Sequence, residues 1–164
     1  MNEELQQVGG DRAGSGSQPR AYLGAFPKSK PMTFDNTMKT EKKRILVVDD
    51  RASDTRLVKL YLERNNDYVV REENDAKSAL SAAEEFEPDL ILLDLMMPGM
   101  DGRELATCFE ANPKLKAVPI VFLTASITKE EVEAVGGRIG KFPFLAKPIV
   151  LSEVAACLKH HLGG

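Results

Sequence analysis

Short apolar runs alternate with segments of helical periodicity from Arg44 almost to the end of the chain. The apolar runs, which we expect to be strands, occupy residues 44–50, 67–73, 88–97, 118–126 and 142–148. The segments with helical spacing occupy residues 53–65, 75–86, 102–112, 128–137 and 151–162. Strands that are apolar throughout are typical of a parallel sheet covered by helices on both faces. Since crossovers are right-handed, this alternation predicts an α/β fold with a five-stranded, parallel, doubly wound sheet.

Polar residues follow these apolar runs at the point where each run ends. Asp49 and Asp50 end the first run and Asp94 interrupts the third, while Thr124 and Lys147 lie at the ends of the fourth and fifth. In a doubly wound sheet, ligands bind beyond the carboxyl ends of the strands, where the strand order reverses. We therefore expect three carboxylates, one hydroxyl and one ammonium group to gather at one edge of the sheet.

This set of groups predicts phosphoryl chemistry with a divalent metal ion. Close carboxylates repel one another and a buried carboxylate is costly, whereas Mg²⁺ prefers a few carboxylate oxygens and keeps several waters. A metal on Asp50 and Asp94, with the backbone carbonyl of Met96, could hold a phosphoryl group against Asp94. Carboxylates form acyl phosphates, and Lys147 and Thr124 would bond the phosphoryl oxygens.

Each of these residues also has an ordinary explanation when it is taken alone. The acidic pair could cap a helix, Asp94 could belong to a turn, and Lys147 could be a surface charge. The presence of all five groups at the expected edge favours one shared site over these separate explanations. The cysteines, Cys108 and Cys157, have no metal-site spacing, and we expect both to be small buried core residues.

Residues 43–162 resemble a response-regulator receiver domain of two-component signalling. The matching motifs, in order, are the acids of ILVVDD, the acid of LILLDLMMPGMDG, the Thr-Ala of VFLTAS and the Lys-Pro of FLAKP. The resemblance implies a flavodoxin-like strand order, 2-1-3-4-5. It also implies a cis peptide bond before Pro148, which is plausible only before proline.

The resemblance assigns a role to each residue of the site. Asp94 is the implied phosphoacceptor, which Thr124 and Lys147 assist through the phosphoryl group. Phe144 matches the aromatic switch position, whose ring turns inward when Thr124 moves toward the phosphate. The Mg²⁺ ligands that the resemblance implies are Asp49, Asp50, Asp94 and the backbone carbonyl of Met96.

A receiver of this kind is a signalling switch and not an enzyme, since it catalyses only its own phosphorylation and dephosphorylation. The expected donor is a sensor histidine kinase or a phosphotransfer protein, and the output passes to an unknown downstream protein. Because the chain ends soon after the last helix, we expect a stand-alone, single-domain receiver. A formal net charge of −3 does not suggest nucleic-acid binding, and no apolar stretch is long enough to cross a membrane. The N-terminus lacks the basic-then-apolar pattern of a secretory signal, so we expect a cytoplasmic protein.

The chain is expected to divide into a flexible N-terminal tail, residues 1–40, and a receiver domain, residues 42–163. The tail is rich in Gly, Ser and charged residues and has little to bury. Met38 precedes the first strand closely and could be an alternative translation start.

Other functions fit part of the pattern. A Mg²⁺-dependent phosphatase with an aspartate nucleophile commonly has a second acid two residues later, where this chain has Met96. An interaction module that takes no phosphate would not need all five site residues. A flavin-binding protein of the same topology is disfavoured because Asp49 and Asp50 would repel the flavin phosphate.

Overall fold

The computed structural model describes residues 41–125 and 138–163. Within them, the strands of the main sheet lie in the order β2-β1-β3-β6-β8-β7. Its parallel strands are β1 (Lys43–Val48), β2 (Tyr68–Glu73), β3 (Leu90–Asp94), β6 (Ile120–Thr124) and β8 (Phe142–Ala146). This arrangement confirms the predicted α/β sheet and the order 2-1-3-4-5.

Two short antiparallel pairs depart from the predicted elements. β7 (Arg138–Ile139) pairs with β8 and extends the sheet by one strand, through a turn in which Gly140 has φ +63°. The predicted run 88–97 divides, because β3 ends at Asp94 and β4 (Met96–Met97) then pairs with β5 (Met100–Asp101). Gly99, with φ +80°, makes the turn between these two strands, a conformation that glycine adopts easily.

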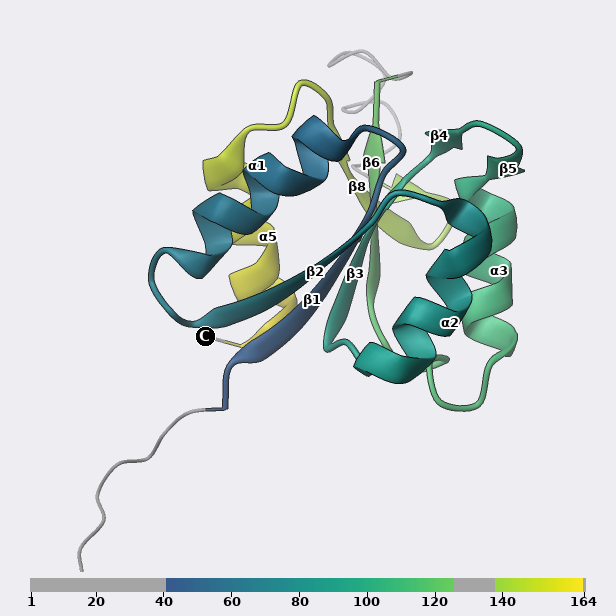
Figure 1. Ribbon diagram of the computed structural model, residues 1–164, viewed down its shortest axis with the longest axis horizontal. Coiled ribbons are helices and arrows are strands. Elements are labelled where there is room, and N and C mark those ends of the chain that lie inside the picture. Colours follow the sequence, from purple (N-terminus) through teal and green to yellow (C-terminus); the bar gives the residue numbers. More distant parts are fainter. Residues whose placement is uncertain (1–40, 126–137, 164) are drawn as a thin grey trace, which may run out of the picture. The chain divides into compact units, whose positions relative to one another are not determined.

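Helices cover both faces of the sheet, as predicted (Figure 1). α1 (Ala52–Glu63) and α5 (Leu151–Leu162) lie on one face, and α2 (Ala76–Phe86) and α3 (Gly102–Ala111) lie on the other. Side chains fix two helix starts, since Asp75 accepts a hydrogen bond from the Lys77 N–H and Asp101 accepts one from the Arg103 N–H. The predicted helix 128–137 and tail 1–40 lie outside the described residues.

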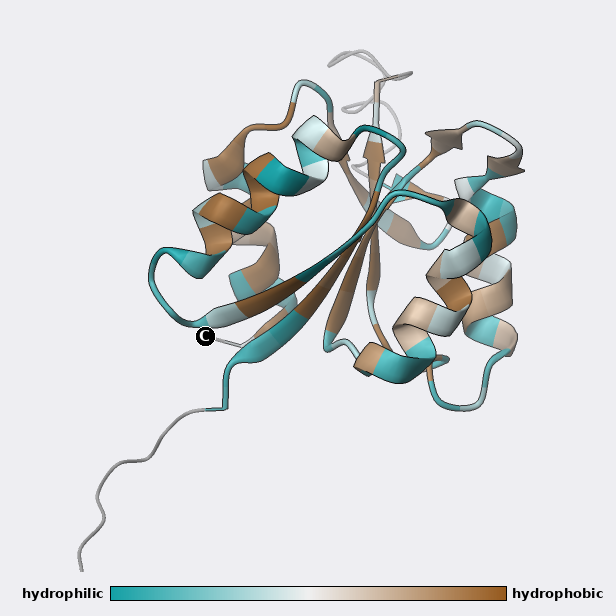
Figure 2. Cartoon of the chain, in the orientation of Figure 1, coloured by the Kyte–Doolittle hydropathy of each residue, from teal (hydrophilic) through white to brown (hydrophobic). Residues whose placement is uncertain are grey.

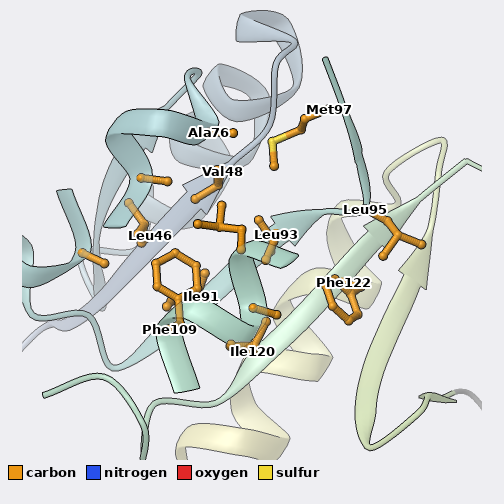
Figure 3. Packing of buried hydrophobic residues seen from close by; sticks show 14 of the residues in the cluster. Leu46, Val48, Ala76, Ile91, Leu93, Leu95, Met97, Phe109, Ile120 and Phe122 are labelled. Carbon is orange, nitrogen blue, oxygen red and sulfur yellow. The ribbon is translucent and has the colours of Figure 1, made fainter. Parts of the chain in front are cut away.

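The alternation of side chains along β1 divides the core into two layers. Leu46 and Val48 belong to the cluster under α2 and α3, whereas Ile45 and Val47 belong to the cluster under α1 and α5. Figure 2 shows the central strands as the most hydrophobic part of the domain, and Figure 3 shows Phe109 of α3 packed against the first layer. Because both faces of the central strands are buried, polar groups are placed at the strand ends.

The outer edge of the sheet at β2 is hydrogen-bonded by side chains of α1. Lys59 Nζ donates to the Val70 carbonyl oxygen at 3.0 Å, and the Val70 N–H donates to Glu63 Oε1 at 2.9 Å. These contacts join the open edge of the sheet to the helix that covers it.

The cysteine prediction is wrong for one residue. Cys108 is exposed on α3, and Cys157 on α5 is half-buried. The residues that α3 buries are Gly102, Leu105, Ala106 and Phe109, and Cys108 is not among them. In the described ranges, no helix is long and apolar enough to span a membrane.

Candidate phosphoacceptor and metal site

The three predicted acids converge at the carboxyl ends of β1 and β3. Asp49, Asp50 and Asp94 each offer a carboxylate oxygen, and these oxygens lie within 4.8 Å of one another. Asp49 and Asp94 are buried, whereas Asp50 is exposed at the surface. β1 and β3 are neighbours in the sheet, so their ends place the acids side by side.

Lys147 lies among these carboxylates, directly after β8. Its Nζ is 2.6 Å from Asp49 Oδ2 and 3.4 Å from Asp94 Oδ2, and only 10% of its side chain is exposed. Its backbone N–H donates to the Thr124 carbonyl oxygen at 2.7 Å, which fixes the start of the loop that carries it. The peptide bond between Lys147 and Pro148 is cis, as the resemblance predicts.

Burial and charge shift the pKa values of Asp94 and Lys147. Burial and the neighbouring Asp49 raise the pKa of Asp94, and the charge of Lys147 and the Met96 N–H oppose this shift only in part. Burial alone would lower the pKa of Lys147, but its hydrogen bond to Asp49 and the charges of Asp49 and Asp94 outweigh burial, so the pKa is raised. Lys147 therefore stays a cation beside the buried acids.

Thr124 and Phe144 occupy neighbouring strands behind the acids. Thr124 is buried at the end of β6, one residue after Leu123, which pairs with Asp94 in the sheet. Phe144 is opposite Phe122 in the pairing of β6 with β8, and it is buried in the core layer under α2 and α3. Phe144 is therefore almost fully covered by its neighbours in the structure.

Met96 and Gly102 shape the loop that follows Asp94. The Met96 N–H donates to Asp94 Oδ1 at 3.3 Å, and Met96 is 64% exposed beside the acids. Gly102 approaches the end of β3 so closely that an added Cβ would lie 2.3 Å from the Asp94 carbonyl oxygen. Gly102 therefore lets the loop lie tightly against the strand that carries Asp94.

Four of the predicted site residues, Asp50, Asp94, Met96 and Lys147, line an open cleft of about 560 Å³. Its walls come from the loop after β1, the start of α1, the end of β3 and the loop after β8. The lining residues are Asp50, Arg51, Asp54, Leu57, Asp94, Met96, Ala125, Lys147, Pro148 and Ile149. A small anion can therefore reach Asp94 from the surface.

Two polar residues of this region were not predicted as part of the site. Asp54, in the first turn of α1, places Oδ2 3.7 Å from Lys147 Nζ. Asn74 Nδ2 donates to the Asp49 carbonyl oxygen at 2.7 Å and to Thr55 Oγ1 at 3.1 Å. The position of Asn74 at the end of the second apolar run was the available signal, and for Asp54 it was the short distance along the chain from the acidic pair.

The donor set fits a small, hard divalent cation. It consists of carboxylate oxygens, without a cysteine or histidine in the described cluster, and oxygen donors are the preference of Mg²⁺. Lys147 offsets one negative charge of this cluster, so a divalent ion would compensate the charge that is left. The residues present are therefore suited to hold Mg²⁺.

Comparison with known proteins gives one family. The model of the response regulator receiver domain matches residues 45–159. The transcriptional regulatory protein ResD of Bacillus subtilis is 43% identical over 121 residues, which cover 73% of this chain and 48% of ResD. The chain thus spans about half the length of this curated relative.

Solved structures give the same fold. The chemotaxis protein CheY4 of Vibrio cholerae superposes with a TM-score of 0.61 at 29% identity, over 73% of this chain and 98% of CheY4. The receiver domain of the sensor histidine kinase PA1611 from Pseudomonas aeruginosa gives a TM-score of 0.62 at 27% identity, over 75% and 99% of the two chains. That structure has a magnesium ion coordinated in its active-site cleft.

Proposed function

Because the chain belongs to the response regulator receiver domain family, we propose that it is a phosphorylation-activated switch whose phosphoacceptor is Asp94. The observation that supports this proposal best is the position of Lys147, whose ammonium nitrogen lies within 3.4 Å of carboxylate oxygens of both Asp49 and Asp94. Such an arrangement brings a cation to the place where phosphoryl charge would accumulate.

In the proposed reaction, a carboxylate oxygen of Asp94 attacks the phosphorus of a phosphohistidine on the donor protein. The new O–P bond forms as the P–N bond breaks, and the imidazole nitrogen keeps the electron pair. Lys147 and the hydroxyl of Thr124 then bond phosphoryl oxygens. Asp49, Asp50, Asp94 and the Met96 carbonyl would hold Mg²⁺, which supplies further neutralisation of the phosphoryl charge when it is bound.

We propose that a sensor histidine kinase or a phosphotransfer protein donates the phosphoryl group. Thr124 would move toward the phosphoryl group, and the ring of Phe144 would turn inward with it. These two movements would shift the population between two states of the domain. The output would pass to a downstream protein, without direct contact with nucleic acid or membrane.

ResD is by its name a transcriptional regulator, so a stand-alone mode of action stays a prediction for this chain. The division into a receiver at residues 42–163 and a tail at residues 1–40 is also part of the proposal.

The test is labelling of the full chain by a small acyl phosphate in the presence of Mg²⁺. Intact-mass measurement is expected to show one added phosphoryl group on the wild type and none on Asp94→Ala. Asp75→Asn is the control, because Asn also caps helices well and Asp75 lies outside the site. Equal labelling of Asp94→Ala and wild type would reject the assignment. Steady turnover of phosphoesters by the wild type would instead favour the phosphatase alternative.

A further inference from the structure

Lys147 has a third acidic neighbour, Asp54, which the proposed reaction does not use. Asp54 Oδ2 lies 3.7 Å from Lys147 Nζ, and Asp54 Oδ1 accepts a hydrogen bond from the Ser53 hydroxyl at 3.3 Å. The Asp54 side chain is 25% exposed and lines the same cleft as Asp94. We propose that Asp54 is a positioning residue that holds Lys147 back and so weakens the docking of a phosphoryl group on Asp94.

Lys147 Nζ has three N–H donors, and three carboxylates surround it: Asp49, Asp54 and Asp94. Asp49 and Asp94 also belong to the acidic cluster suited to a metal ion, whereas Asp54 does not. Once metal and phosphoryl groups engage Asp49 and Asp94, Asp54 is the carboxylate that still draws Lys147 toward α1.

The negative charge of Asp54 also weakens phosphoryl docking, in addition to its attraction of Lys147. A phosphoryl group is anionic, and Asp54 adds a negative charge to the cleft through which the group arrives. Both effects predict tighter phosphoryl docking when the charge of Asp54 is removed. This inference rests on the proposed function, because it concerns the same phosphoacceptor.

The expected size of the change in affinity follows from the exposure of the ion pair between Asp54 and Lys147. Partly exposed ion pairs contribute about 0.2–1 kcal/mol, which corresponds to a change in affinity of about 1.4-fold to fivefold. Salt screens such pairs over a Debye length of about 8 Å at physiological ionic strength. The effect of Asp54 is therefore expected to decrease as salt is added.

The experiment measures binding of trifluoroberyllate, an anion that mimics a phosphoryl group on a carboxylate, at saturating Mg²⁺. Asp54→Asn is expected to bind it about 1.4-fold to fivefold more tightly than the wild type, with a smaller difference at high salt. Asp54→Glu keeps the charge and is expected to restore wild-type affinity, and Asp75→Asn is the control for loss of a carboxylate elsewhere. Unchanged or weaker binding by Asp54→Asn would overturn the inference.

A second measurement needs no metal and no phosphoryl mimic. In metal-free protein, nuclear magnetic resonance of the lysine ammonium groups is expected to show faster exchange of the Lys147 ammonium protons with water in Asp54→Asn. Equal exchange rates would show that Asp54 does not hold Lys147. If the wild type neither binds trifluoroberyllate nor accepts a phosphoryl group, the proposed function fails. If the wild type does both and Asp54→Asn matches it, only the role of Asp54 fails.

Discussion

Replacing Gly102 with alanine is expected to destabilise the end of β3 that carries Asp94. An alanine Cβ would lie 2.3 Å from the Asp94 carbonyl oxygen and 2.9 Å from Leu95 Cα. Both contacts are with backbone atoms, so no side-chain rotation can relieve them. Overpacking in a well-packed region costs about 1–3 kcal/mol, and we expect about 3 kcal/mol here because the backbone itself must move. The same movement is expected to reduce phosphoryl labelling of Asp94.

The assay is urea unfolding of the metal-free protein, with linear extrapolation of the free energy to water. Gly140→Ala is the matched control, because Gly140 has φ +63° and an added Cβ would meet nothing within 4 Å. That variant is expected to lose only about 1–2 kcal/mol, from the left-handed backbone, and to keep normal labelling. This prediction is wrong if Gly102→Ala is as stable as the wild type, or if Gly102→Ala loses no more stability than Gly140→Ala and labels normally.

Two other predictions concern the acidic site. Mg²⁺ at about 100 times its dissociation constant is expected to raise the free energy of unfolding by about 2.7 kcal/mol, if it binds only the folded state. Thermal unfolding with and without Mg²⁺ measures this gain in stability. Asp50→Ala removes one of the clustered carboxylates and is expected to lose most of the gain. A full gain in that variant would exclude Asp50 as a ligand. Asn74→Ala removes the hydrogen bonds that the Asn74 amide donates to the Asp49 carbonyl and the Thr55 hydroxyl. The loss of these two bonds is expected to lower the free energy of unfolding in urea by about 1–3 kcal/mol. No loss would indicate that water replaces the amide at both groups.

The strand order and the meeting of the acids could be predicted because both follow from the same pattern. A residue such as Leu92 in β3 is buried because helices cover both faces of the sheet, and the run therefore reads as apolar without interruption. Where such a run ends in an acid, the acid must lie at the sheet edge, as Asp49 and Asp94 do. The topology then brings these ends together without further information from the sequence.

The features that were missed depend either on geometry over one or two residues or on contact between segments that are distant in the sequence. β7 consists of Arg138 and Ile139, too short to show a period of alternation. Cys108 comes directly before the buried Phe109, yet the angle between successive helical residues turns Cys108 to the solvent. The pairing of Asp54 with Lys147 joins α1 to the loop after β8, a contact across the sheet edge that no local spacing encodes.

The hydrogen bonds of Lys59 and Glu63 with the backbone of Val70 bear on how molecules of this protein can associate. An exposed edge strand is a template on which another chain can add a strand, and this is a common route to aggregation. At β2 an incoming strand would have to displace an ammonium and a carboxylate before it could pair with Val70. Self-association by sheet extension is therefore disfavoured at this edge.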